Sequence, residues 1–357
     1  MNVLLCLSHS IEEYDQLRLL SGLGYTVASI GGYIDPRHPH DDKRPALDID
    51  VVPEIKAAVD SFGTTDNLGA AQTNLPPAIL DWADVIIFHH YLPRLFGQWP
   101  AIRAWLDRGS HRRVIWRTVG QSVTNNEEEA GPFRKDGLEI VRYSPKERNI
   151  PGYAGEDALI RFYKDPAEWD GWEGFLAEDP FIVNFTQHDA TPHGRDEWVN
   201  WAFWEAATQG YRVEFGGPHT DLIGGHGSLP IGDMQSWLRH GRVYLYTGTQ
   251  PASYTLGLIE AMMTGIPVVS IAPQFMRIFP YGPDLFEGLD IAGYGAGAAD
   301  GYIPSDEQVI ANTRDILGQM LTDPRFAYNA GRYARLRAIE LFGMATIGAQ
   351  WKAFLGA

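Results

Sequence analysis

The sequence contains a single cysteine, Cys6, among its 357 residues. One cysteine excludes an intrachain disulfide and any metal site built from several thiolates. Cys6 lies in an apolar run near the amino end, so we expect it to be a small buried hydrophobic residue. Thiol chemistry is therefore no part of the expected function.

Long hydrophobic runs are also absent. No uninterrupted apolar stretch approaches the roughly 18 residues that span a membrane, so the sequence predicts no integral membrane segment. The apolar residues 1–7 are too few for a signal peptide and lack its basic leading residues. We expect them to form a buried first strand, and we expect a cytoplasmic protein.

Basic residues are scarce relative to acidic ones. The 29 Lys and Arg residues against 45 Asp and Glu residues give a formal net charge of -16. Such a field repels polyanions unless a local basic patch overrides it. The charge therefore counts against a nucleic-acid acceptor without excluding one.

The glycine fingerprint of dinucleotide-binding proteins is missing too. After the first apolar run the sequence reads LSHSIEEYD, where that fingerprint would place G-x-G-x-x-G. This difference argues against an NAD-dependent oxidoreductase.

Short runs rich in Val, Ile and Leu alternate with helical patterns through the first half of the chain. Continuous apolar strands indicate a parallel sheet that is buried on both faces. A strand–helix alternation of this kind is typical of doubly wound α/β domains. The strands predicted in this half are 2–8, 25–30, 85–90, 113–119 and 139–144.

A polar stretch with several tryptophans, residues 165–179, interrupts this alternation and predicts a linker or domain border. The alternation then restarts, so the sequence predicts two doubly wound Rossmann-like domains, residues 1–172 and 173–339. Ligands of such sheets gather at the carboxyl ends of the strands, so we expect a site in a cleft between the domains. The strands predicted in the second half are 181–185, 212–215, 243–246 and 267–271.

The most informative segment is YLYTGTQPASYTLGLIEAMMTGIPVVS, residues 244–270. A strand and a polar turn precede a helix that begins near Thr255, and Gly265 stands at its carboxyl-terminal cap. The unpaired N–H groups and dipole at such a helix start suit a diphosphate. Glu260 lies one turn further, where a carboxylate can accept two hydrogen bonds from a ribose diol. Other expected nucleotide contacts are Thr249, Ser253, Tyr254 and Leu256.

Structural alternatives exist for these residues. Glu260 can be a solvent-facing helical carboxylate, and the hydroxyl groups can cap the helix, a role that is compatible with phosphate contact.

This segment resembles the signature of the retaining family-four glycosyltransferases, Gly-Leu-x-x-x-Glu-Ala-Met-x-x-Gly-x-Pro-Val-Val. Thr255 stands in place of the usual first glycine. Gly216 and Gly217 resemble the family's glycine turn beside the nucleotide, and residues 317–342 resemble its tail helices. The matching residues of the signature are Leu256, Glu260, Ala261, Met262, Gly265, Pro267, Val268 and Val269.

The resemblance implies the GT-B fold: two Rossmann-like domains face each other across a cleft. The amino-terminal domain binds the acceptor and the carboxyl-terminal domain binds the nucleotide sugar. The last helix, residues 340–357, crosses back to the amino-terminal domain. The resemblance also implies that Glu260 binds the donor ribose.

Further positions depart from the family pattern. The family's second glutamate, eight residues before the ribose-binding one, is Ala252 here, which leaves the catalytic residue open. The family's Arg and Lys that neutralise the diphosphate are not visible after the strand 181–185. Gln187 and Arg195 occupy that region, and Arg195 is the candidate replacement cation, with a surface salt bridge as its alternative.

Candidate catalytic residues of the amino-terminal domain follow from its strand ends, which face the cleft in such sheets. They are His9, His89, His90 and Arg117, and a structural role is the alternative for each. The acidic residues 127–129 are expected to form an exposed loop.

The resemblance implies transfer of a sugar from a UDP- or GDP-sugar to a hydroxyl group of a glycan, lipid or other small acceptor. It also implies retention of the anomeric configuration, without a metal or cofactor. Two alternatives stay open. One is a phage-type DNA glycosyltransferase that acts on hydroxymethylated bases, and the other is a non-catalytic GT-B protein that binds nucleotides, which Ala252 favours.

Overall fold

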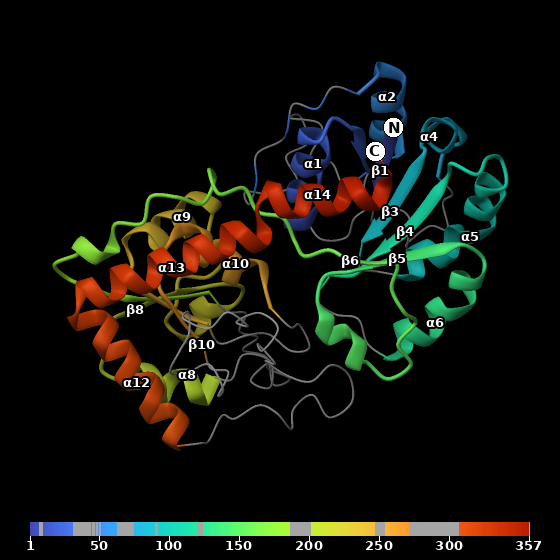
Figure 1. The fold of residues 1–357 in the computed structure, drawn as a ribbon. Coiled ribbons are helices and arrows are strands. Elements are labelled where there is room, and N and C mark those ends of the chain that lie inside the picture. Colours follow the sequence, from blue (N-terminus) through green and yellow to red (C-terminus); the bar gives the residue numbers. More distant parts are fainter. Residues whose placement is uncertain are drawn as a thin grey trace. The chain divides into compact units, whose positions relative to one another are not determined.

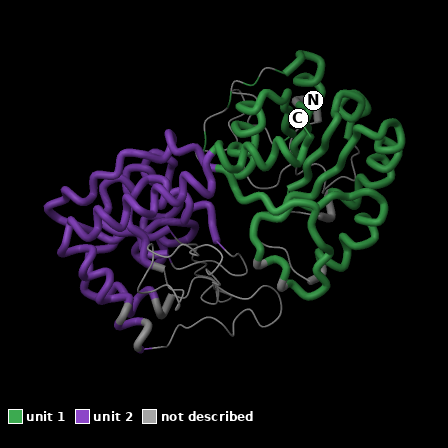
Figure 2. The backbone as a smooth tube through the Cα atoms, viewed as in Figure 1, with its two compact units in different colours: residues 1–163, 344–357 green, residues 164–343 purple. Residues whose placement is uncertain are grey.

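The structure, a computed structural model, describes residues 1–6, 10–30, 44, 47, 49, 51–62, 75–89, 92–119, 124–185, 201–246, 254–270 and 307–356. The chain divides into two compact units (Figure 2). Unit 1 contains Met1–Tyr163 and Met344–Ala357, and unit 2 contains Lys164–Gly343.

Unit 1 is built on a six-stranded parallel sheet of order β2-β1-β3-β4-β5-β6 (Figure 1). Its strands are β1 (Asn2–Cys6), β2 (Thr26–Ser29), β3 (Val85–His89), β4 (Arg113–Arg117), β5 (Leu138–Arg142) and β6 (Ala158–Leu159). Its helices are α1 (Ser10–Gly22), α2 (Pro53–Phe62), α4 (Pro77–Trp82), α5 (Leu92–Leu106), α6 (Thr124–Lys135) and α14 (Met344–Leu355), with a 3₁₀ helix at Pro145–Asn149.

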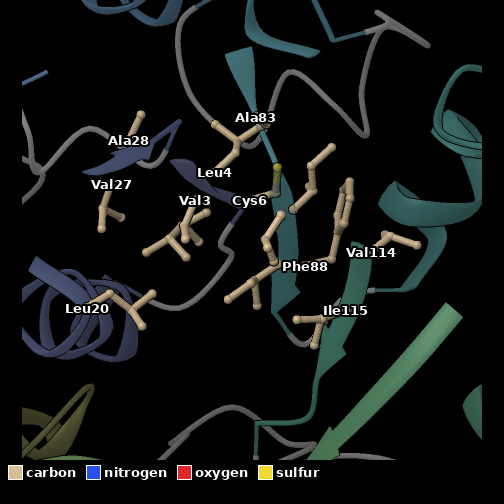
Figure 3. Packing of buried hydrophobic residues seen from close by; sticks show 14 of the residues in the cluster. Val3, Leu4, Cys6, Leu20, Val27, Ala28, Ala83, Phe88, Val114 and Ile115 are labelled. Atoms are coloured by element: carbon tan, nitrogen blue, oxygen red, sulfur yellow. The ribbon is translucent and has the colours of Figure 1, made fainter. Parts of the chain in front are cut away.

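The core of unit 1 lies along the central strands. Nearly all side chains of β1, β3 and β4 are buried, as the continuous apolar runs predicted. Figure 3 shows Leu4 and Cys6 of β1 beside Phe88 of β3 and Val114 of β4, with Leu20 contributed by α1. Cys6 is thus a buried core residue, as expected.

The last helix begins at Met344, where a start at residue 340 was expected. Helix α13 ends at Phe342, and α14 begins at Met344 after Gly343. In α14, Ile347 and Trp351 are completely buried in the core of unit 1. An Nη1–H group of Arg113 in β4 donates to the main-chain oxygen of Phe354 at 2.8 Å. These contacts place α14 with unit 1.

Unit 2 is built on a four-stranded parallel sheet of order β10-β9-β7-β8. Its strands are β7 (Ile182–Phe185), β8 (Val213–Gly216), β9 (Val243–Tyr246) and β10 (Val268–Ser270). Its helices are α8 (Trp201–Thr208), α9 (Ile231–His240), α10 (Leu256–Thr264), α12 (Glu307–Thr322) and α13 (Pro324–Phe342), with 3₁₀ helices at Gly174–Leu176 and Thr220–Ile223.

Residues 164–172, expected to belong to the amino-terminal domain, are part of unit 2. Arg335 of α13 holds this segment, because its Nη1 donates to the main-chain oxygen of Trp169 at 2.6 Å. Its Nη2 reaches the main-chain oxygen of Pro166 at 3.2 Å.

Among the described residues, no helix is both long and apolar enough to cross a membrane.

Candidate functional site

The sheet of unit 2 has a topological switch point between β7 and β9. Strand β7, the first of this unit, pairs with β8 on one side and with β9 on the other. All neighbours are parallel, so the chain leaves β7 after Phe185 and β9 after Tyr246 at the same edge of the sheet. Ligands of doubly wound sheets bind at this place, which makes it the candidate site of unit 2.

Strands β7 and β9 pair only at their first residues, Ile182 with Val243 and Val183 with Tyr244. At the next position the side chain of Asn184 donates from Nδ2 to the main-chain oxygen of Leu245 at 2.7 Å. Its Oδ1 is buried and has no hydrogen-bond partner among the described residues. Sequence reasoning missed Asn184, although an amide inside the apolar run FIVNF was a visible signal.

Helix α10 starts beside this switch point, after β9. Thr255 is its N-cap, and its Oγ1 accepts a hydrogen bond from the N–H of Leu258 at 3.3 Å. Gly265 ends the helix with φ of 95°, a left-handed conformation that favours glycine. The start and end of this helix were therefore predicted correctly from the sequence.

Tyr254 and Leu256, two of the expected nucleotide contacts, are buried in the protein interior. Tyr254 is buried, and its ring centroid lies 5.9 Å from that of Phe342 in α13. The side chain of Leu256 is also buried. Tyr254 thus packs the start of α10 against α13, and the burial of Leu256 agrees with the apolar helix face on which the sequence places it.

Glu260 lies in α10 as predicted, but its surroundings differ from the expectation. The residue is only 1% exposed, and its Oε1 lies 2.5 Å from the Nζ of Lys164. Lys164 is completely buried. Sequence reasoning missed Lys164, because 96 residues separate it from Glu260 and nothing in its local sequence marks it.

Two buried tyrosines of β9 lie before α10 in the chain, and the charge of Glu260 acts on one of them, Tyr244. Burial raises the pKa of Tyr244 far above its ordinary value, and the charges of Tyr246 and Glu260 add to this effect. Burial also raises the pKa of Tyr246, opposed by Thr255 close to its hydroxyl group. Both phenols are therefore neutral in any ordinary buffer.

Gly216 is the last residue of β8, and Gly217 follows it at the same edge of the sheet. A Cβ at Gly216 would lie 2.5 Å from Cδ1 of Leu229, so only glycine fits there without a shift. Gly217 has φ of 137° and donates from its N–H to the main-chain oxygen of Gly227 at 2.7 Å. Because β7 lies between β8 and β9, this turn is two strands away from α10.

Several predicted site residues lie outside the described residues. These are Gln187, Arg195, Thr249, Ala252 and Ser253 of the expected donor site, and His9 and His90 of the expected acceptor site.

Unit 1 has its own switch point, between β1 and β3, since β2 lies on the other side of β1. His89 is the last residue of β3, and its register partner in the neighbouring strand is Arg117, the last residue of β4. The structure therefore brings together two of the predicted catalytic residues. Both are buried.

Arg117 interacts with main-chain and side-chain groups of unit 1. Its Nη1 donates to the main-chain oxygen of Arg142 at 3.0 Å and to that of Ile160. Its Nε lies 3.7 Å from Oε1 of Glu12, which is buried in the first turn of α1. These contacts give Arg117 a structural role in joining β4, β5 and the end of β6, which was the alternative to contact with a substrate.

The acidic residues 127–129 form part of helix α6, where an exposed loop was expected. Glu127 is buried and accepts two hydrogen bonds from Arg142, at 2.6 and 2.7 Å. Because a bidentate pair satisfies both groups, these buried charges are stable here. Only a long-range partner, invisible in the local sequence, explains this burial.

Glu147 lies next to this pair. Its Oε2 accepts hydrogen bonds from the Thr118 hydroxyl group at 2.9 Å and from the N–H of Tyr143 at 3.0 Å. Burial raises its pKa to about 7, because desolvation outweighs the nearby charge of Arg142 and these hydrogen bonds.

In the part of the chain that the structure describes, no group of three or more His, Cys, Asp or Glu residues is arranged to hold a metal ion.

No protein-family model matches the chain, and no curated protein matches it in sequence. Solved structures match it in fold. The Anabaena protein HepE, in complex with UDP and glucose, has a TM-score of 0.60 at 13% identity, and the match covers 100% of this chain and 99% of HepE. An alpha-glucosyltransferase in complex with UDP-glucose and DNA containing an abasic site has a TM-score of 0.61 at 8% identity, with 100% of both chains covered.

A third match, TarM, has a TM-score of 0.49 at 15% identity and covers 76% of this chain, which spans 55% of the length of TarM. The first two matches extend over the whole chain. Together with two parallel-sheet Rossmann-like units, they show that this protein has the GT-B fold. The expected fold class is thus confirmed.

Proposed function

We propose that this protein transfers a sugar from a nucleoside-diphosphate sugar to a hydroxyl group of an acceptor. The observation that carries the proposal is α10, a capped helix that starts after β9 at the switch point of unit 2 and carries Glu260. The GT-B neighbours with UDP or UDP-glucose bound favour a UDP-sugar as the donor.

The diphosphate would bind at the amino end of α10. The first N–H groups of a helix lack partners within the helix, and its dipole places partial positive charge there. In the transition state the leaving diphosphate gains negative charge, so this end of the helix would stabilise the departing group. The Thr255 hydroxyl accepts from the main chain of the first turn and keeps this end in place.

The ribose would bind to Glu260 through its two hydroxyl groups. Because Glu260 is only 1% exposed, a nucleotide reaches it only after the residues that cover it have moved. Donor binding would then be accompanied by a local rearrangement around Glu260.

The acceptor would bind to unit 1 at the β1/β3 switch point, where His89 ends β3. We propose retention of the anomeric configuration. In such a reaction the leaving phosphate takes the proton of the incoming hydroxyl group, so positioning contributes most of the rate. An NMR spectrum of the fresh product would show its anomeric configuration.

We favour a glycan, lipid or other small acceptor over nucleic acid, because the formal net charge of -16 repels a polyanion. The DNA complex of one GT-B neighbour makes hydroxymethylated duplex DNA the second acceptor to test. Radiolabelled sugar appearing in the duplex, and in no glycan or lipid, would reverse this preference.

The donor site is tested by calorimetry with UDP on the wild type and on Glu260→Gln, with Glu205→Gln as a control on the exposed face of α8. A hydrogen bond to a charged group contributes about 1.5–3 kcal/mol, so we expect UDP affinity to fall at least about tenfold in Glu260→Gln and to stay unchanged in the control. Unchanged affinity in Glu260→Gln would remove the ribose assignment. Failure of UDP, GDP and their sugars to raise the unfolding temperature of the wild type would remove the proposed function.

A further inference from the structure

Lys164 is the first residue of unit 2, and its buried ammonium group lies against Glu260 of α10. Its Nζ lies 2.5 Å from Oε1 of Glu260 and 5.9 Å from the ring centroid of Trp169. The N–H of Lys164 donates to the main-chain oxygen of Phe342 at 3.0 Å, so the last turn of α13 holds its main chain. Both the main chain and the side chain of Lys164 are thus held in place.

The segment that carries Lys164 is fastened to both helices behind the site. Arg335 of α13 donates to the main-chain oxygen atoms of Trp169 and Met263, which joins the segment to the end of α10. Trp172 packs where Gly265 of α10 meets Gly331 of α13. Residues 164–172 therefore deliver Lys164 to Glu260 as part of a rigid arrangement.

Among the described residues, the phenols of β9 and the guanidinium of Arg335 do not replace the ammonium of Lys164. Burial keeps the phenols of Tyr244 and Tyr246 neutral, since it raises both pKa values. The guanidinium of Arg335 is engaged with main-chain oxygen atoms. A buried carboxylate is costly to ionise without a paired positive charge, so the ammonium group of Lys164 stabilises the charged form of Glu260.

We propose that Lys164 is a positioning residue of the donor site, whose ammonium group keeps Glu260 ionised and oriented to receive the ribose hydroxyl groups. This inference rests on the proposed function, because it takes Glu260 as the ribose ligand. An ionised carboxylate accepts hydrogen bonds with both oxygens, whereas a protonated one donates with one of them and binds a diol less well. Discrimination between ribose and deoxyribose should therefore depend on Lys164.

The test compares UDP with 2′-deoxy-UDP by calorimetry between pH 6 and pH 9. The variants are Lys164→Met, Lys164→Arg and Lys164→Met with Glu260→Gln, and Lys352→Met on the exposed side of α14 is the control. For the wild type and the control we expect 2′-deoxy-UDP to bind about tenfold more weakly at every pH, the loss of one charged hydrogen bond.

Lys164→Met should bind UDP at least about tenfold more weakly than the wild type does at pH 6. The variant should bind UDP and 2′-deoxy-UDP with equal affinity at this pH. Its affinity for UDP should rise with pH, because a buried carboxylate that has lost the neighbouring ammonium group loses its proton only at higher pH. Lys164→Arg keeps the charge and should keep the discrimination. The double variant removes both charges, so it folds without an unpaired buried ion, and it should lack discrimination at every pH.

Two results would overturn the proposed role of Lys164 and leave the proposed function standing. In one, Lys164→Met discriminates between UDP and 2′-deoxy-UDP as the wild type does at all pH values. In the other, that variant binds UDP more tightly than the wild type. Tighter binding would mean that Lys164 competes with the ribose for Glu260. A wild type that binds UDP and 2′-deoxy-UDP equally well would instead remove the ribose assignment of Glu260, and the inference with it.

Discussion

The close contact between α10 and α13 predicts that replacing Gly331 with alanine destabilises the protein, although such a replacement ordinarily stabilises a helix. Gly331 lies in the middle of α13, where replacing glycine with alanine ordinarily stabilises a helix by about 1 kcal/mol. At this position a Cβ would lie 2.0 Å from the main-chain oxygen of Gly265 and 3.1 Å from Cζ3 of Trp172. The oxygen atom belongs to the main chain and cannot rotate away, so the two helices would have to separate.

Overpacking of this kind typically costs about 1–3 kcal/mol, and here the close partner is a main-chain atom. A main-chain partner places the cost in the upper part of this range, about 2–3 kcal/mol, so after subtraction of the helix-propensity gain of about 1 kcal/mol we expect Gly331→Ala to destabilise unit 2 by about 1–2 kcal/mol. For a domain of this size, each kcal/mol corresponds to about 2–4 °C in Tm, so the Tm of unit 2 should fall by about 2–8 °C.

The assay is thermal unfolding followed by circular dichroism, with urea denaturation as a second measurement. Gly232→Ala is the control, because Gly232 lies in the first turn of α9 in the same unit and a Cβ there has nothing within 4 Å. We expect the control to be equally or more stable than the wild type, by at most about 1 kcal/mol. A Gly331→Ala variant at least as stable as the wild type would refute the reasoning, because the close approach of α10 and α13 would then not exist.

Two further predictions concern a buried acid and a helix cap. Glu147→Gln tests the raised pKa of about 7: an acid whose pKa is higher in the folded state contributes stability below its ordinary value of 4.5 and loses it as the pH rises through 7. The wild type should therefore lose about 3 kcal/mol relative to Glu147→Gln between pH 4 and pH 8 in urea denaturation, and parallel pH curves would contradict this expectation. Thr255→Ala should lower the stability of unit 2 by about 1 kcal/mol, since it removes the N-cap of α10, and an unchanged urea midpoint would show that Thr255 does not cap the helix.

The fold was predictable because its signals are local. Strand β3 and its neighbours are continuous apolar runs, and burial on both faces of a parallel sheet requires such runs. Helix α10 was predictable for the same reason, because Thr255 and Gly265 are typical capping residues at the right spacing. Gly216 was found through its position after a strand, where its lack of a side chain makes room for Leu229.

The buried charges could not be predicted in the same way. Glu127 sits in an acidic run that is typical of an exposed loop, and only its pairing with Arg142 explains its burial. Arg117 looked like a substrate ligand at a strand end, yet its partners include the main-chain oxygen of Ile160, 43 residues away. Local sequence shows which charges exist, whereas burial depends on partners that the fold brings together.

The same reasoning explains why only part of the candidate donor site could be predicted from the sequence. The family-like motif located Glu260 on α10, but its ion-pair partner Lys164 lies next to a segment that reads as a linker. A residue beside a linker is held this firmly only if other contacts fix its main chain, and Arg335 and Phe342 provide them. The stability of unit 2 and the chemistry of its candidate site therefore depend on the same contacts, so a variant that loosens α13 from α10 should weaken UDP binding as well as folding.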